Sequence, residues 1–529
     1  MKKTIVLFAV LAALSFSAAA QNLNPEVRVT NDYMISQGEV SKLDLPMAVP
    51  DSLMHFDYHF DYSVSDSPYK GAYEFSPYAV TITPAFRPYD GRKLFLKAGA
   101  GFVFKPELDF VWAPLDTKKA SLNVFASADG YWGNYRRIGL TSYESEAGEY
   151  TKGYDFAATA GLDGRFSLGG SDLRVQLGYD GFYNAHEAVA GGAYHSPWLQ
   201  ARFGSESGRW MAYDLVLTGR YISDMTEGPD PLNAFELGFI ARTAPGIKGW
   251  PVTPLLDLDV AANSWYTAVS IKPHATVNLG GFDIDAGVSV GYAGRFTIHP
   301  DVTVKYKIPA AGLELFAGAV GKDHHMQYSD YKSRYHFYST QYGDPSTIRE
   351  TADFFLGVSG HAGTSFQYKL DGGLRMLENA PFWAMEGGAG ETLYFQPCNL
   401  WHASLKLSWS SENFSAEGKA DFTKPLRELD PGVFAPSMLT GGVEFGYNWL
   451  KRIYAGISAS GALRRTAVYN GGEKHIPGYV DLGVRGEYKF SRKLSFWLKG
   501  SNLLAQDIRI SPMVSECAPA VVAGVILNF

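Results

Sequence analysis

The most constraining feature of this sequence is an alternation of apolar and polar residues that recurs along most of its 529 positions. From Lys93 onward, segments of about ten to sixteen residues alternate in this way and are separated by turn residues. Residues 479–490 are the clearest example, because one face is apolar while the other carries Asp481, Arg485 and Glu487. Side chains of a strand point alternately to its two faces, so each segment predicts a strand with one apolar and one polar side.

Other segments place carboxylates and lysines on the polar face in the same way. A soluble sandwich also alternates, but it rarely repeats the pattern some twenty times in one chain. A membrane barrel repeats the pattern in every strand, because its apolar residues face lipid and its polar residues face the lumen. We therefore predict an all-β transmembrane antiparallel β-barrel. The residues expected to line its lumen are Asp257, Asp259, Asp283, Asp285, Lys305, Lys307, Glu417, Asp421, Asp481, Arg485 and Glu487.

The spacing of the alternating segments predicts about 22 strands, closed between a first strand near Lys93 and a last strand ending at Phe529. An even number places both ends on the periplasmic side, with long external loops and short periplasmic turns. Long connections such as 321–350 and 385–397 fall outside, and short ones such as 280–281 fall on the periplasmic side. Parity also places two short connections, near 262–264 and 294–298, on the outside, so a slip there would change the count by two.

The chain ends in a nonapeptide whose alternate residues are all apolar, namely Val521, Ala523, Val525, Leu527 and Phe529. Taken alone, it fits a buried strand of a soluble sandwich as well as a membrane strand. Within the barrel interpretation it is the closing strand, and the face formed by these five residues is expected to contact lipid.

The amino-terminal region differs from the rest of the chain. Residues 1–20 combine two lysines, a short apolar run and small residues before Gln21, which is typical of an export signal peptide and too short for a spanning helix. Residues 21–90 are acidic and proline-containing, and we interpret them as a periplasmic or lumen-occupying leader to the barrel of residues 91–529. The alternating stretch at 55–64 leaves a first pair of barrel strands as the competing interpretation.

Composition excludes several classes of protein. The formal net charge of -7 provides no basic field for nucleic acid, and no later stretch is apolar and long enough to form a spanning helix. Cys398 and Cys517 are the two cysteines. In an oxidising compartment they can either pair or remain free, and the sequence does not distinguish these states.

Motifs for catalysis are absent from the sequence. It contains no G-x-S-x-G, H-E-x-x-H, phosphate-binding loop or dinucleotide-binding motif, so we expect neither an enzyme, a metal site nor a cofactor. The longest predicted external loop is rich in histidine and tyrosine. Adjacent histidines can bind a metal, but neighbours in an extended chain point apart. The loop is either a solvated loop, a lumen constriction, or a surface that binds a glycan or partner protein. The binding candidates are His324, His325, Tyr328, Tyr331, Tyr335 and Tyr338.

The carboxyl-terminal sequence resembles the last two strands of TonB-dependent-receptor barrels. Residues 492–504 form a strand with an Asn502-Leu503-Leu504 corner, followed by a loop and a strand with a terminal aromatic residue. The segments around 369–381, 26–29 and 60–62 are similar to a plug-poor subgroup of these barrels. The resemblance implies an outer-membrane receptor-like barrel whose last strand is recognised by the barrel assembly machinery. It departs from the family in having only about 70 residues before the barrel, too few for a full plug domain.

Together these features predict a barrel of the bacterial outer membrane, in contact with its lipid, that binds a solute or lets it pass without energy coupling. The competing function is a non-conducting scaffold that holds partner proteins through its outer loops or its leader. An outer-membrane hydrolase has only scattered histidines and carboxylates to support it.

Overall fold

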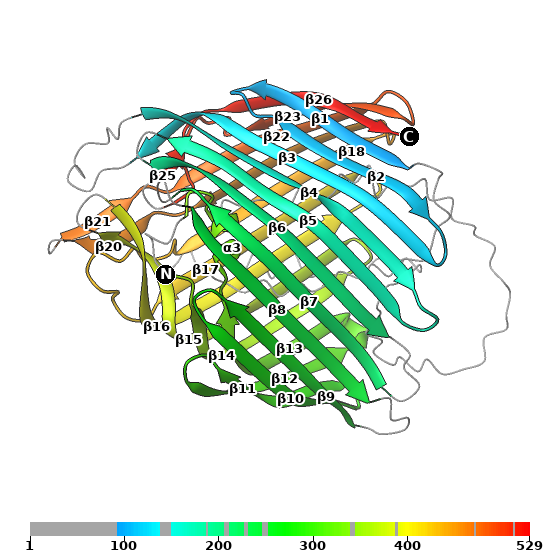
Figure 1. The fold of residues 1–529 in the computed structure, drawn as a ribbon, viewed down its shortest axis with the longest axis vertical. Coiled ribbons are helices and arrows are strands. Elements are labelled where there is room, and N and C mark those ends of the chain that lie inside the picture. Colours follow the sequence, from blue (N-terminus) through cyan, green and yellow to red (C-terminus); the bar gives the residue numbers. More distant parts are fainter. Residues whose placement is uncertain are drawn as a thin grey trace.

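The protein is described from a computed structural model (Figure 1). The structure describes residues 93–137, 150–186, 189–205, 211–226, 231–245, 252–338, 344–386, 390–469, 472–511 and 514–529. The predicted signal peptide and leader lie outside the described residues.

Twenty-two strands form one closed antiparallel barrel, as the sequence predicted. Its first eleven strands are β1 (Leu94–Phe102), β2 (Glu107–Asp116), β3 (Ala120–Arg137), β4 (Tyr150–Ser167), β5 (Asp172–His186), β6 (Val189–Ser205), β7 (Met211–Asp224), β8 (Leu232–Pro245), β9 (Val252–Asn263), β10 (Thr267–Leu279) and β11 (Phe282–Tyr292). The other eleven are β12 (Phe296–Ile308), β13 (Leu313–His325), β14 (Thr347–Ala362), β15 (Phe366–Glu386), β16 (Gly390–Ser410), β17 (Phe414–Pro425), β18 (Leu439–Trp449), β19 (Ile453–Ala462), β22 (Tyr479–Lys489), β23 (Leu494–Ser501) and β26 (Ala520–Asn528).

A few short elements accompany the barrel. Strands β20 (Arg465–Tyr469) and β21 (Gly472–Ile476) pair only with each other and form a hairpin. Strands β24 (Ile508–Arg509) and β25 (Val514–Glu516) lie between β23 and β26, and β25 extends the sheet beside the end of β3. The described helices are the single turn η1 (Pro309–Ala311) and α3 (Tyr328–Arg334).

Closure of the barrel follows from the pairing of its first and last strands. β26 pairs with β1 from Phe102↔Val521 to Phe95↔Asn528, and with β23 on its other side. The backbone N–H of Leu94 donates to the Phe529 carbonyl oxygen at 2.8 Å, which completes the seam. A closed barrel leaves no unpaired sheet edge, so its backbone hydrogen-bonding groups are satisfied without water. The predicted closure near Lys93 is therefore confirmed.

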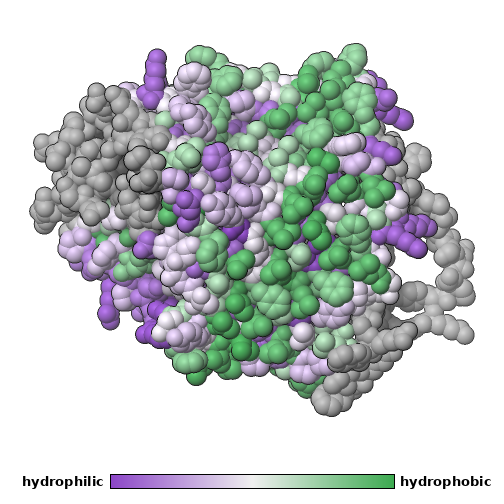
Figure 2. Space-filling model, in the orientation of Figure 1, coloured by the Kyte–Doolittle hydropathy of each residue, from purple (hydrophilic) through white to green (hydrophobic). Residues whose placement is uncertain are grey.

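The outward face of the barrel is apolar. Val521 and Phe529 of the last strand are about half exposed, while Val522 and Ile526 on the opposite face are buried against Phe95 and Trp497. Figure 2 shows a broad hydrophobic band across the visible face, with hydrophilic residues toward both ends. This band is what the apolar side of the alternation predicts for a lipid-facing wall.

Short turns join the strands at the end of the barrel that holds the carboxyl terminus. The β10–β11 turn consists of Gly280 and Gly281, whose φ angles are 55° and 98°. Positive φ is accessible to glycine at little cost, which is why a two-residue turn fits here. Gly99 and Gly524 have a different role, because the Trp497 ring lies on both of them and a side chain at either position would collide with it.

Several strands extend further into the outer region than the sequence predicted. The segment 385–397 was expected to be a loop, but β15 runs to Glu386 and β16 begins at Gly390. Farther along the chain, β19 ends at Ala462 and the β20–β21 hairpin continues the strand pairing beyond it. Above the membrane neither face has to be apolar, so pairing continues where the alternating pattern fades.

None of the described helices is long and apolar enough to cross a membrane.

Candidate functional site in the lumen

Four of the six lumen-facing candidates on β9 to β12 take part in cross-strand ion pairs. The carboxylate of Asp283 is 2.7 Å from the Lys307 ammonium group, and that of Asp285 is 2.7 Å from the His274 ring. Asp257 lies 3.7 Å from both Lys272 and His274. Each pair joins neighbouring strands on the polar side of the wall, so their charges largely cancel locally.

The candidates on the later strands are also mostly satisfied. Asp421 lies 3.0 Å from Lys419, and Arg485 lies 3.0 Å from Glu444 and also donates to the Tyr454 hydroxyl. Asp481 instead accepts a hydrogen bond from the backbone N–H of Asn502 at 2.7 Å. These contacts stiffen the wall and leave few free charges.

Four candidates have no ion pair within the described part of the chain, namely Asp259, Lys305, Glu417 and Glu487. Glu417 lies directly opposite Glu444 in the register of β17 and β18, so two carboxylates are neighbours there. Asp259 lines a cavity that is described below. The structure therefore separates a paired majority from a small unpaired group that the sequence pattern did not distinguish.

Several buried charged pairs of the lumen were not predicted from the sequence. The Asp353 carboxylate lies 2.7 Å from the His402 ring and 3.0 Å from the Arg375 guanidinium group, and the His299 ring is 3.2 Å from the Asp323 carboxylate. All are on the polar face of their strands. The two-residue periodicity of a strand would have predicted that these histidines face the lumen. Only the strand register shows which carboxylate each of them contacts.

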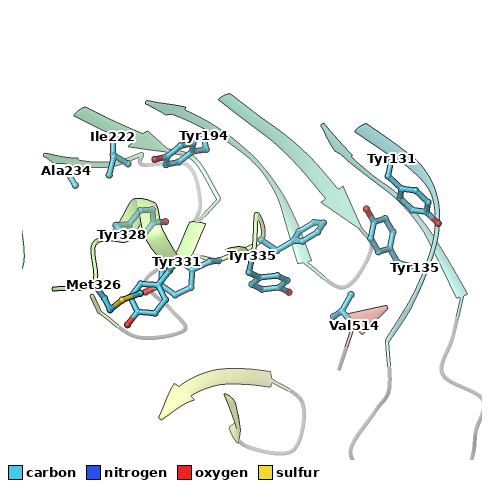
Figure 3. Close-up of a cluster of buried hydrophobic side chains, with 12 residues drawn as sticks. Tyr131, Tyr135, Tyr194, Ile222, Ala234, Met326, Tyr328, Tyr331, Tyr335 and Val514 are labelled. Carbon is cyan, nitrogen blue, oxygen red and sulfur yellow. The ribbon is translucent and has the colours of Figure 1, made fainter. Parts of the chain in front are cut away.

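The first part of the connection between β13 and β14 folds into the barrel instead of standing in solvent. We call residues 326–338, which include α3, the inward segment. α3 begins with a capping box in which the Gln327 backbone N–H donates to Asp330 Oδ2 at 2.8 Å. The segment packs on the inner face of the wall formed by β3 to β8, near the outer ends of those strands (Figures 1 and 3).

Three carboxylates of this wall hold the inward segment, and the Asn184 side-chain amide also donates to the His336 carbonyl oxygen at 2.7 Å. The fully buried Asp224 carboxylate accepts from the Tyr328 hydroxyl at 2.6 Å and lies 2.8 Å from the Lys332 ammonium group. Glu236, which is also buried, accepts from the backbone N–H and the hydroxyl of Ser329. Buried charges persist only when they are paired and hydrogen-bonded, so these contacts define one docked position.

The third carboxylate, Asp155, forms an ion pair with His336 at 2.9 Å that is only partly buried. Burial by itself lowers the pKa of His336, but the nearby Asp155 carboxylate more than offsets this, so the pKa lies above its ordinary value. The His336 ring also stacks on Phe182 with centroids 4.1 Å apart. The charged form of His336 therefore favours docking.

Aromatic rings fill the space between these polar contacts. Tyr328 stacks on Trp265 with centroids 5.5 Å apart, and Tyr331 stacks on Tyr338 at 5.1 Å. The cluster continues to Val514 of β25, beside the outer end of β3, as Figure 3 shows. Buried aromatic pairs add stability beyond their area, so the cluster holds the segment against several strands at once.

The tyrosines that were predicted as binding candidates in this loop do not lie on a solvated surface. The side chains of Tyr328, Tyr331, Tyr335 and Tyr338 are buried, and burial raises the pKa of the Tyr331 hydroxyl. Their burial against the inner wall fits the lumen-constriction alternative. The spacing of Tyr328, Tyr331 and Tyr335 fits one face of a helix, which is the pattern that would have indicated it.

The two adjacent histidines have separate protein partners. His324 Nε2 is 2.6 Å from the Glu350 carboxylate, while His325 Nδ1 is 3.3 Å from the Thr347 hydroxyl. Among the residues that the structure describes, no group of three or more potential ligands gathers in one place. Cys398 and Cys517 are both free, and burial raises the pKa of the Cys517 thiol to about 12.

A cavity of about 400 Å³ lies between the inward segment and the wall. Strands β7 to β9 supply one side, the last residues of β13 supply another, and α3 covers it with Asp330 and Arg334. Pockets of this size are typical of small-molecule sites. The arrangement can enclose a small polar solute inside the lumen.

Comparison with known proteins shows which folds this barrel is similar to. No protein-family profile and no curated protein matches the chain. Among solved structures, the siderophore receptor PirA from Acinetobacter baumannii shares 10% identity, with 83% of this chain and 80% of that chain covered and a TM-score of 0.58.

Two further solved structures are similar. The copper transporter OprC shares 11% identity over 83% of this chain and 80% of its own, with a TM-score of 0.60. The FrpB iron transporter from Neisseria meningitidis shares 9% identity over 83% and 81%, with a TM-score of 0.61. The fold is thus that of TonB-dependent-receptor barrels, as the terminal motifs predicted. The closed barrel and its apolar outer face place the chain in the bacterial outer membrane.

Proposed function

We propose that this chain is a non-enzymatic outer-membrane barrel that binds a solute in its lumen or passes it passively, with the inward segment closing the outer entrance. The observation that carries the proposal is the attachment of that segment, which rests on three carboxylates and an aromatic cluster. Such an attachment can release without disturbing the strand pairing of the barrel. The similar solved structures are described as receptors and transporters, which supports a transport role.

Conductance across planar bilayers tests this function. Purified full-length protein is expected to give stepwise conductance that increases when the inward segment is released. Silence under all conditions, with stable co-purifying proteins, would instead favour the scaffold. That second function is supported by β15 and β16, which are 21 residues long each, and by the β20–β21 hairpin at the outer rim.

We also infer a function for the leader, residues 21–90. The described chain starts at Lys93, whose backbone N–H meets the Phe529 carbonyl oxygen at the periplasmic end of the seam. A leader of residues 21–90 therefore enters the barrel region at its periplasmic mouth, where we infer that it obstructs the lumen. Its deletion is expected to raise conductance several-fold in folded barrels. Unchanged conductance would remove this role and leave the inward segment as the only closure.

The closing strand carries a proposed signal for assembly. Phe529 is half exposed at the periplasmic end and lies beneath the Lys493 ammonium group at 5.4 Å from the ring. We infer that the barrel assembly machinery recognises this terminal aromatic residue. Replacement by alanine is expected to lower the amount of folded barrel in outer membranes, while Phe490→Ala, at another exposed ring, serves as the matched control.

A further inference from the structure

The cavity under the inward segment differs from the rest of the lumen wall in its unpaired charges. Within the described chain, neither the Asp259 carboxylate nor the Lys322 ammonium group takes part in a hydrogen bond or ion pair, although both line the cavity. Most charges of the neighbouring wall are paired within about 4 Å, as for Lys272 with Asp301 at 2.8 Å. Two opposite charges thus face one enclosed space without neutralising each other by contact.

A third polar group in the same cavity, the His325 ring, is only partly satisfied by hydrogen bonds. His325 Nδ1 contacts Thr347, but its buried Nε2 atom has no hydrogen-bond partner among the described residues. His325 interacts electrostatically with Asp259. Buried polar atoms are nearly always satisfied, and an exception in a cavity calls for a partner that is not part of the protein.

The other residues that line the cavity limit the size and shape of a ligand that fits it. Val216, Ile240 and Ala261 provide an apolar floor, while Thr218 uses its hydroxyl on the Gly238 carbonyl oxygen. A cavity of about 400 Å³ accepts a small molecule but excludes a folded protein or a long polymer. No phenylalanine, tyrosine or tryptophan is among the described residues that line it, so the large stacking surface that sugars favour is missing from this site.

We propose that the cavity binds a small zwitterion, of the size of an amino acid or dipeptide, with its ammonium group at Asp259 and its carboxylate at Lys322. The His325 Nε2 atom would complete the polar contacts, and the apolar floor would take the side chain or the Cα region. This inference rests on the proposed function and names its solute class. Because Asp330 and Arg334 of α3 also line the cavity, a bound solute would contact the inward segment directly.

Calorimetric titration of the full-length folded barrel with alanyl-alanine tests the proposal, alongside the same dipeptide blocked by N-acetylation or by carboxyl-terminal amidation. Saturable binding is expected for the free dipeptide, with each block weakening it by roughly tenfold or more, since each removes one charge-assisted contact. Equal binding of all three, or no binding of the free dipeptide, would overturn the proposal.

Two substitutions assign the ends of the ligand. Asp259→Asn is expected to remove the penalty for N-acetylation but keep the penalty for amidation, and Lys322→Gln is expected to do the reverse. Lys272→Gln, on the paired wall, is the matched control and should leave both penalties in place. Migration of the unheated barrel on denaturing gels confirms that each variant is folded. Saturable binding in a barrel that never conducts would uphold the site and reject passage of the solute.

Discussion

The two halves of the wall from β3 to β14 differ in what covers their polar groups. Strands β3 to β8 bury a few charges beneath the aromatic inward segment, as with Asp224 and Glu236. Strands β9 to β14 carry the buried pair of His299 with Asp323 and also cross-strand pairs that are partly open to the lumen, such as Asp283 with Lys307. A pair in contact with water contributes little to stability, whereas a buried charge depends strongly on its partner. The first half is therefore a docking surface, and the open pairs of the second half form a hydrated wall.

The largest expected effect comes from removing the buried cation. Lys332→Met leaves the Asp224 carboxylate buried without its partner, which costs about 3–5 kcal/mol of docking free energy. Trypsin cleavage after the neighbouring Arg334 reports the undocked population in the folded barrel, and its rate is expected to rise roughly 100-fold or more.

The double variant Lys332→Met with Asp224→Asn is the matched control for this change. It removes both charges, so most of the protection against trypsin should return. Unchanged cleavage in the single variant would mean that the buried pair does not hold the segment in place.

An intermediate effect is expected from pH. The pKa of His336 in the docked state is raised above its value in the undocked state, so docking is favoured fully below about pH 6.5 and the contribution is lost as pH rises through the raised value. Asp155, Asp129 and Lys332 are the charged groups that face this ring. Conductance and cleavage after Arg334 should both increase on the alkaline side, by an amount equivalent to about 1 kcal/mol or less.

Asp155→Asn sharpens the pH experiment. Without the carboxylate, the pKa of His336 is no longer raised, so the increase with pH should flatten and the segment should be looser already at acidic pH. If the variant retains the dependence seen in the native sequence, another group is responsible for it.

The smallest effect is expected on the hydrated wall. Lys307→Met breaks the 2.7 Å pair with Asp283, yet the lysine side chain is 42% exposed, so the stability should fall by about 1 kcal/mol at most. Thermal unfolding checks the stability, and trypsin cleavage after Arg334 should not change. A loss comparable to that of Lys332→Met would erase the distinction between the two halves of the wall.

Period-two alternation and the terminal motif were enough to predict the barrel, its 22 strands and its closure, because lipid imposes one face on every strand. The outer extensions of β15 and β16 were missed, since no such constraint acts above the membrane. Polar-face residues such as Asp283 and Asp285 could be named in advance, whereas their partners depend on register and were not predictable.

The inward segment was the hardest part to predict. Its tyrosines have helical spacing, but a short aromatic loop is equally suited to solvent, a partner or the lumen. Its direction depends on Asp224 and Glu236, which are about a hundred residues away along the chain. The unpaired state of Asp259 and Lys322 likewise appears only when the neighbours of each side chain are known.

Single-channel recording of the barrel before and after deletion of residues 327–338 tests the central claim most directly. The residues that remain between β13 and β14 are sufficient for a short external loop, so the strand pairing should persist. We expect rare or small openings for the full-length protein, a larger conductance after the deletion, and a continuously open one when residues 21–90 are deleted as well. Identical conductance of the two proteins, with both barrels folded, would contradict the claim that the inward segment closes the outer entrance.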